Sequence, residues 1–193
     1  MADFDASYRE GTPPWDIGRP QPAFVRLFDA DEVRGQVLDV GCGTGEHALL
    51  AAGRGFEATG IDAAPTAIGL ATEKAAQRSI SAHFEVWDAL ELPALGRQFD
   101  TVLDCGLFHV FDDDDRARFV RSLSASVVPA GRYFLLCFSD KQPGDWGPRR
   151  VRQEELLHCF AGGWRVDSIE ETVLDLTWGP EGARSWLAAM TRI

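Results

Sequence analysis

The chain alternates between short apolar runs and longer amphipathic stretches. Apolar runs closed by glycine or charged residues predict strands, and stretches with apolar residues three or four positions apart predict helices. The predicted strands cover 36–40, 56–61, 81–87, 99–103, 132–138, 164–174 and 185–193. The predicted helices cover 22–31, 45–54, 64–78, 113–128 and 152–160.

This order predicts an α/β fold. Strands that alternate with helices form right-handed crossover units, so we expect a Rossmann-like, mainly parallel sheet of seven strands with helices on both faces. The turn-rich segment 175–184 joins the last two strands in place of a helix. We therefore expect an antiparallel final pair at one edge of the sheet. A chain of 193 residues suits a single domain, 1–193.

The first 22 residues are polar and contain four of the ten prolines, at positions 13, 14, 20 and 22. Proline interrupts both helices and strands, so this segment predicts an extended arm or loop. An arm of this kind either packs on the domain surface or closes over a bound ligand.

The net charge of −11 argues against a nucleic acid or an anionic membrane as partner, because phosphate groups repel an acidic surface. The one basic cluster, Arg149, Arg150 and Arg152, is short. No apolar run approaches the roughly 20 residues that span a bilayer, and the acidic N-terminus is unlike a signal peptide. We expect a cytoplasmic protein that is a monomer or a homodimer.

Cysteine and histidine usage indicates neither disulfides nor a metal. The four cysteines, at 42, 105, 137 and 159, are scattered singly and are interpreted as small reduced hydrophobes, although Cys105 could contact a ligand. The acids at 112–115 open a predicted helix, where they complement its dipole. His47, His83 and His158 have no spacing typical of metal ligands.

The segment 37–46, Val-Leu-Asp-Val-Gly-Cys-Gly-Thr-Gly-Glu, carries the clearest chemistry. A strand ends in the alternate glycines Gly41, Gly43 and Gly45 and passes directly into a helix. Such glycines let a ligand approach the backbone closely, and the helix directs free N–H groups at the same crevice. In an open α/β sheet this crevice is where ligands bind.

The spacing of these glycines separates two cofactor classes. A dinucleotide site requires G-x-G-x-x-G, whereas this chain has G-x-G-x-G. Asp39 lies two residues before the first glycine, where it would repel a pyrophosphate but attract the ammonium of an amino acid. The pattern therefore fits an amino-acid nucleoside better than NAD.

Acids also follow the next two strands. Asp62 can accept hydrogen bonds from ribose hydroxyls, or can cap the helix that begins near Ala64. Asp88 can accept from the exocyclic amine of adenine, with Trp87 and Ala89 packing on the ring, or can be a solvated loop residue.

Taken in order, these segments resemble the class I methyltransferases that use S-adenosylmethionine (SAM). Asp-Val-Gly-Cys-Gly-Thr-Gly looks like the first motif of that family, Gly-Ile-Asp at 60–62 the second, Val-Trp-Asp-Ala at 86–89 the third, and Phe-Asp-Thr-Val-Leu-Asp-Cys-Gly-Leu-Phe-His at 99–109 the fourth. The resemblance covers about 22–193 and implies that the glycines border methionine, Asp62 the ribose and Asp88 the adenine. The candidate cofactor-binding residues are Trp15, Asp39, Gly41, Cys42, Gly43, Gly45, Asp62, Ala63, Trp87, Asp88, Ala89 and Asp104.

The arm sequence Pro-Trp-Asp-Ile-Gly-Arg-Pro-Gln-Pro at 14–22 is similar to that of bacterial small-molecule methyltransferases of the thiopurine, tellurite-resistance and heterocyclic-toxin type. That likeness implies a small-molecule acceptor and a lid formed by Trp15 and Tyr8. A flat aromatic or heterocyclic acceptor, methylated at oxygen, nitrogen or sulfur, fits the aromatic residues near the crevice. The candidate acceptor-binding residues are Tyr8, Trp15, Phe108, His109, Asp140 and Trp146.

Methyl transfer to such an acceptor depends mainly on holding the reacting atoms in line. His109 is the candidate general base, because its ordinary pKa lies near neutrality, but it can equally be a packed or capping histidine. Two other functions remain open: a non-catalytic SAM-binding protein and an NAD(P)-dependent oxidoreductase. The missing third Rossmann glycine argues against the second.

Overall fold

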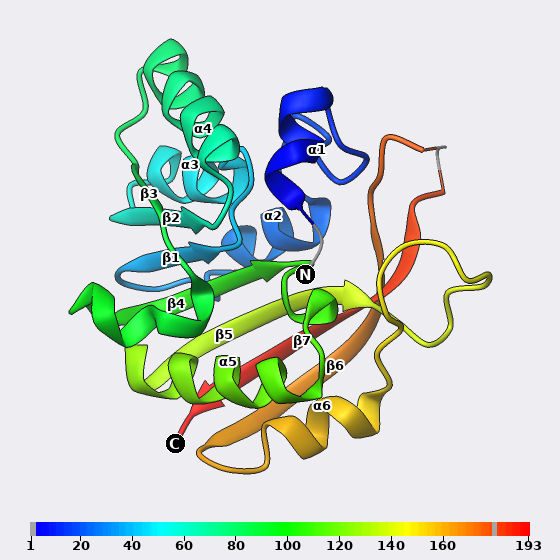
Figure 1. Ribbon diagram of the computed structural model, residues 1–193. Coiled ribbons are helices and arrows are strands. Elements are labelled where there is room, and N and C mark those ends of the chain that lie inside the picture. Colours follow the sequence, from blue (N-terminus) through cyan, green and yellow to red (C-terminus); the bar gives the residue numbers. More distant parts are fainter. Residues whose placement is uncertain (1–2, 179–180) are drawn as a thin grey trace.

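The computed structural model describes residues 3–178 and 181–193 (Figure 1). Its centre is one sheet of seven strands in the order β3-β2-β1-β4-β5-β7-β6. The strands are β1 (Val37–Val40), β2 (Ala58–Asp62), β3 (His83–Val86), β4 (Phe99–Cys105), β5 (Val127–Phe138), β6 (Trp164–Leu174) and β7 (Ala183–Arg192). The helices are α1 (Phe4–Glu10), α2 (Pro22–Asp29), α3 (Glu46–Gly53), α4 (Pro65–Arg78), α5 (Asp113–Ser126) and α6 (Gln153–Cys159), with short 3-10 turns η1 (Ala89–Leu95) and η2 (Phe108–Val110).

Strands β1 to β5 run parallel, and β7 runs antiparallel to both of its neighbours, β5 and β6. This arrangement confirms the predicted α/β fold and the antiparallel last strand. Because β7 inserts between β5 and β6, the edge of the sheet is β6. The strand order reverses between β1 and β4, which places a crevice beyond the carboxyl ends of these two strands.

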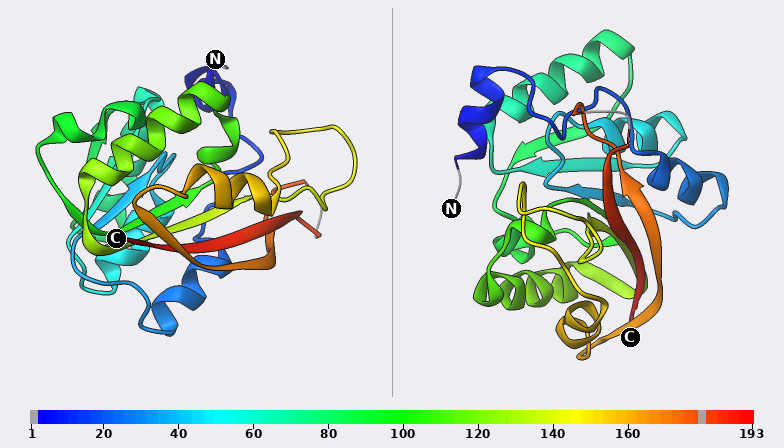
Figure 2. Two further views of the ribbon diagram at one scale, coloured as in Figure 1. Left: turned by 90° about the horizontal axis from the view of Figure 1, so that it is seen from below. Right: turned by 90° about the vertical axis from the view of Figure 1, so that its right-hand side faces the viewer.

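Apolar side chains fill both faces of the sheet, as the buried parallel strands require. One face packs against η1, α5 and α6 and contains a cluster of aromatic rings around Tyr133. The other face packs against α2 and α3, with Phe24 and Phe28 of α2 buried there. Figure 2 shows these two helical layers on either side of the sheet.

Two local predictions were wrong. Residues 4–10 form helix α1 instead of extended chain, because Asp3 caps the helix by accepting from the Ala6 N–H (3.0 Å). Residues 129–131, which separate the predicted helix 113–128 from the predicted strand 132–138, lie inside β5, which begins at Val127 directly after α5. Ala130 accommodates this with a left-handed backbone (φ 64°).

Candidate functional site

The glycine loop lies where β1 passes into α3. All three glycines adopt positive φ angles, of 67°, 52° and 83° at Gly41, Gly43 and Gly45, so the loop conformation requires them. A Cβ atom at Gly43 would lie 2.6 Å from the Tyr8 hydroxyl oxygen. The α1 helix therefore already covers the loop closely, and a side chain here would displace it.

Asp39, in β1, is completely buried beneath this loop. One carboxyl oxygen accepts from the Ala48 N–H (3.0 Å), whereas the other, Oδ1, has no hydrogen-bond partner among the described residues. Burial raises the pKa of Asp39 to about 8, and nearby Asp62 and Asp104 add to the rise. A buried carboxyl with a free oxygen fits an ammonium group, which supports the expected amino-acid end of the cofactor.

Asp62 ends β2 on the other side of the loop. Its two carboxyl oxygens accept from the backbone N–H groups of Gly43 and Ala64, each at 2.8 Å. Burial raises the pKa of this carboxyl. The same residue thus ties the glycine loop to the start of α4, and its remaining lone pairs are free for ribose hydroxyls.

Residues after β3 form the next wall. Asp88 is exposed and caps η1 by accepting from the Leu90 N–H (2.9 Å). Trp87 is half-buried, and its indole N–H donates to the Glu91 carbonyl (3.0 Å). Ala63 and Ala89 lie beside Asp62 and Asp88 in the chain, on the two loops that would border an adenosine.

Two of the expected site residues serve the core. Asp104 of β4 is fully buried and accepts from the Tyr133 hydroxyl (2.7 Å) and the Leu107 N–H (2.8 Å). Phe108 is fully buried under the Arg116 guanidinium and beside Phe160, so its ring does not line the crevice. An aromatic residue after β4 looks the same in the sequence whether it faces core or ligand.

The arm packs over the crevice as a small aromatic unit. The Trp15 indole N–H donates to the Tyr8 hydroxyl (2.9 Å), and the Phe4 ring lies edge-on to Trp15. The Thr66 N–H of α4 donates to Asp5 (2.8 Å), which holds α1 against α4. Trp15 nevertheless keeps 40% of its surface exposed, so it lies at the rim.

Hydrogen bonds that the sequence did not predict hold the arm to the β6–β7 connection, and this contact is called the strap. The buried Gln21 side chain accepts from the Asp175 N–H (2.8 Å) and donates to the Asp175 carbonyl (3.0 Å). The Thr177 N–H donates to the Pro14 carbonyl (2.9 Å). Gln21 and Asp175 are single polar residues outside the predicted helices and strands, so no periodic pattern in the sequence predicts a contact between them.

His47 was also missed. Its Nε2 accepts from the Gln21 N–H (3.2 Å), and its Nδ1 lies 3.8 Å from the free oxygen of Asp39. Burial lowers the pKa of His47 to about 4, so the ring is neutral. A single buried histidine therefore connects the arm with the carboxyl under the glycine loop.

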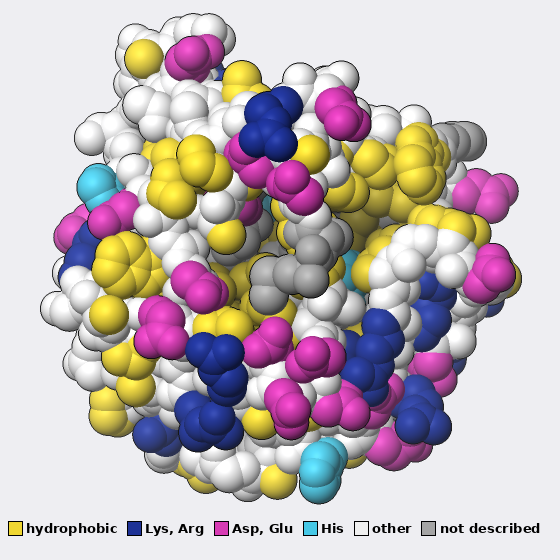
Figure 3. Space-filling model, in the orientation of Figure 1, with side chains coloured by type: hydrophobic (Ala, Val, Ile, Leu, Met, Phe, Trp, Pro, Cys, Tyr) yellow, Lys and Arg dark blue, Asp and Glu magenta, His cyan; other side chains and the backbone are white. Residues whose placement is uncertain are grey.

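The opposite side of the crevice is formed by the ends of β4 and β5. His109 of η2 is buried, and its Nδ1 accepts from the Phe138 N–H (3.1 Å). Trp146 lies edge-on to Phe138 (5.6 Å between ring centres) and beside Trp178 (6.1 Å). Asp140 is exposed. Figure 3 shows hydrophobic side chains gathered along the rim between the arm and the loop that follows β5.

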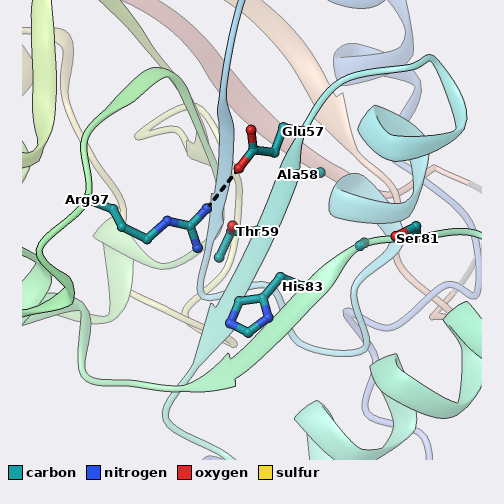
Figure 4. A pocket seen from close by; sticks show the side chains of 7 residues that line it. Glu57, Ala58, Thr59, Ser81, His83 and Arg97 are labelled. Carbon is teal, nitrogen blue, oxygen red and sulfur yellow. Dashed lines mark hydrogen bonds and ion pairs between the residues drawn. The ribbon is translucent and has the colours of Figure 1, made fainter.

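A hollow at the other end of the sheet is unrelated to this crevice (Figure 4). It lies at the amino ends of β2 and β3, between Thr59, His83 and the ion pair of Glu57 with Arg97 (3.5 Å).

Across the described ranges, no three acidic, cysteine or histidine side chains cluster as metal ligands. None of the helices described is long and apolar enough to cross a bilayer.

Comparison with known proteins identifies the family. A sequence family described as a methyltransferase domain matches residues 37–131. The 2-heptyl-1-hydroxyquinolin-4(1H)-one methyltransferase of Mycobacteroides abscessus is 37% identical over 176 residues, which is 86% of this chain and 78% of that protein. A probable thiol methyltransferase of Arabidopsis thaliana is 25% identical, over 79% of this chain and 68% of that protein.

Solved structures agree. A structure described under "Conversion of a Disulfide Bond into a Thioacetal Group during Echinomycin Biosynthesis" has a TM-score of 0.87 and 38% identity, covering 98% of this chain and 91% of that one. TehB from Haemophilus influenzae shares the fold, with a TM-score of 0.70 and 17% identity over 87% of this chain and 61% of that one. The chain belongs to the class I SAM-dependent methyltransferase family.

Proposed function

We propose that the protein methylates a small, flat aromatic or heterocyclic acceptor at oxygen, nitrogen or sulfur. The observation that carries this proposal is the aromatic rim of the crevice, formed by Trp15, Trp146 and Trp178, which keep 40%, 39% and 62% of their surfaces exposed. Large exposed rings around a concave site favour a flat apolar ligand. The relative that is named for a hydroxyquinolone supports the same acceptor class.

SAM supplies a methyl group bonded to a positively charged sulfur. The sulfur is a good leaving group once a nucleophile is in line with the bond between carbon and sulfur. The chain's own task is therefore positioning. Asp39 with its free oxygen would hold the ammonium of the methionine part, and Asp62 and Asp88 would hold the adenosine. Each fixed contact reduces the freedom of the methyl carbon relative to the acceptor.

The arm would exclude water from this reaction. Tyr8 and Trp15 close over Gly43 through a hydrogen bond between their side chains. Closing a site of this kind keeps the acceptor aligned and strengthens the electrostatic contacts within it. The arm then has to open for exchange of SAM and S-adenosylhomocysteine (SAH).

The test is an assay with methyl-labelled SAM and a panel of phenols, heterocyclic thiols and N-hydroxy heterocycles, including a 1-hydroxyquinolin-4(1H)-one. The expected result is a labelled product with an equal amount of SAH. Binding of SAH without turnover of any acceptor would favour a SAM-binding protein that is not catalytic. Calorimetry that finds no affinity for SAH would overturn the whole assignment.

A further inference from the structure

The acceptor side of the crevice holds one histidine whose hydrogen-bonding role is fixed by the fold. His109 follows β4, and its Nδ1 accepts from the backbone N–H of Phe138 at the end of β5 (3.1 Å). A neutral imidazole has one donor nitrogen and one acceptor nitrogen. With Nδ1 occupied as acceptor, the proton of the ring is on Nε2.

Nε2 points toward the end of β4. A Cβ atom placed on Gly106, the residue after β4, would lie 3.2 Å from Nε2, so any other residue here would crowd this nitrogen. Nε2 is not one of the fully buried side-chain atoms that lack a partner among the described residues, although the ring as a whole is buried. No described residue accepts a hydrogen bond from it. The ring therefore presents a donor, rather than a proton acceptor, to the crevice.

The charged groups that act on this ring are both cations, Arg116 from α5 and Arg150 from the loop after β5. Burial, reinforced by these two charges, lowers the pKa of His109 to about 3 and keeps the ring neutral. Arg116 is paired with Glu155 (3.4 Å), in a network that also contains Arg149.

Arg150 is held without a carboxylate among the described residues. Its guanidinium donates to the carbonyls of Pro148 (2.7 Å), Gly144 (3.1 Å) and Gln142 (3.3 Å), and lies 5.3 Å and 5.6 Å from the ring centres of Phe138 and Trp146. Neutral carbonyl groups fix the position of the cation but leave its charge uncompensated. Arg150 therefore places a positive charge without an ion-pair partner among the described residues beside the aromatic end of the crevice.

Given the proposed function, we infer that the acceptor binds as an anion, as an ionised aromatic hydroxyl, N-hydroxyl or thiol whose negative atom accepts from His109 Nε2–H. The acceptor's electron pair forms the bond to the methyl carbon, while the carbon–sulfur bond breaks and leaves its pair on sulfur. An anion and a sulfonium cation thereby become two neutral products. No proton has to be removed, so the site needs no general base.

The first test uses 4-nitrothiophenol, thiophenol and 4-methoxythiophenol, which differ in acidity but little in shape. We expect kcat/KM to rise with pH for each thiol and to level off above the pKa measured for that thiol alone. A midpoint common to all three thiols, or a fall above the thiol pKa, would show that the neutral thiol reacts with help from an enzyme base and would overturn the inference.

The second test compares His109→Gln, which retains a donor but no base, with His109→Phe, which retains neither. A lost hydrogen bond to a charged group corresponds to a roughly 10- to 100-fold lower kcat/KM, expected for the Phe variant and only in part for the Gln variant. Equal loss in both variants, with SAH affinity and thermal stability unchanged, would contradict the donor role. If the Phe variant fails to fold, the pH dependence of the three thiols with the unaltered enzyme tests the inference by itself. Absence of turnover with every acceptor would instead refute the proposed function.

Discussion

At the scale of single residues, buried carboxyl groups lie near the carboxyl ends of the strands that border the crevice. Asp39, Asp62 and Asp104 lie within the last two residues of three neighbouring strands, and burial raises the pKa of each, to about 8 for Asp39 and about 7 for Asp104. An unfolded aspartate titrates near pH 3.9. At these three residues the folded protein therefore binds more protons than the unfolded chain between about pH 4 and pH 8, and their contribution to the free energy of unfolding falls as pH rises through that window. The buried His47 and His109, with pKa values lowered to about 4 and about 3, act in the opposite sense up to about pH 6.5, where an unfolded histidine loses its proton.

Asp39→Asn isolates one part of this dependence. The amide oxygen can still accept from the Ala48 N–H, but the group no longer ionises. Without ligand, we expect raising the pH from 5 to 8 to lower the urea stability of the variant less than that of the unaltered protein. The pH dependence that remains in the variant comes from Asp62, Asp104, His47 and His109. Affinity for SAM should drop about 10-fold, because a charge-assisted contact is lost. Identical slopes would show that Asp39 is ionised throughout.

Gly43→Ala tests the close contact between the loop and the arm. The substitution places a Cβ where Tyr8 now lies, at a residue with positive φ, and we expect SAH affinity to fall at least about 10-fold by calorimetry. Gly96→Ala is the matched control, since Gly96 also has positive φ (64°) but open space around its Cβ position. It should lose about 1 kcal/mol of stability and keep its SAH affinity.

The sequence identified the residues at strand ends but not the direction of their side chains. Asp39 and Asp104 occupy equivalent places, yet one has a free oxygen while the other is saturated by Tyr133 and backbone N–H groups. Tyr133 is 29 positions away in the chain. Such a distant partner is set by tertiary packing and leaves no local pattern.

At the scale of elements, the arm and the β6–β7 connection form one unit. Gln21→Ala would leave the N–H and carbonyl of Asp175 without their partners, and we expect a loss of about 2 kcal/mol of stability. Hydrogen exchange of residues 13–21 should speed up in parallel. Arg19→Ala, which removes an exposed ion pair with Asp175, should cost well under 1 kcal/mol. Equal losses of stability in the two variants would show that the buried Gln21 side chain does not hold the arm to the β6–β7 connection.

Helices and strands were predicted correctly where the apolar pattern in the sequence is long, and incorrectly where it covers only a few residues. Helix α4 and strand β4 begin within one residue of expectation, because each carries a long apolar pattern. Helix α1 has seven residues and only two large apolar side chains, Phe4 and Tyr8, so its pattern is too short to predict a helix beside the prolines that follow. Its stability comes from packing on α4, which the local sequence does not encode.

At the scale of the whole molecule, the inserted strand β7 joins the two halves of the sheet. Trp186 of β7 is buried, and its indole N–H donates to the Val151 carbonyl (2.9 Å). Trp186→Ala should therefore cost about 3–5 kcal/mol in chemical denaturation. Trp178→Ala is the matched change at an exposed ring and should stay within about 0.5 kcal/mol.

The same two variants, Trp186→Ala and Trp178→Ala, distinguish an effect on stability from an effect on acceptor binding. Because Trp178 lies beside Trp146 at the rim, its removal should raise KM for the acceptor while the denaturation midpoint stays unchanged. A stability loss comparable with that of Trp186→Ala would instead place Trp178 among the residues that hold the fold together.

The strap between Gln21 and Asp175 bears on how this enzyme could be redesigned. Grafting a foreign loop between β5 and α6 should alter which acceptors are accepted and leave the donor site untouched, because the described hydrogen bonds of that loop run within it and to neighbouring elements such as β7 and α5, and none reaches the arm over the donor site. Grafting between β6 and β7 would disturb both substrates at once, since the arm over the donor site is tied there. Acceptor range and donor affinity are therefore separable at one loop and inseparable at the other.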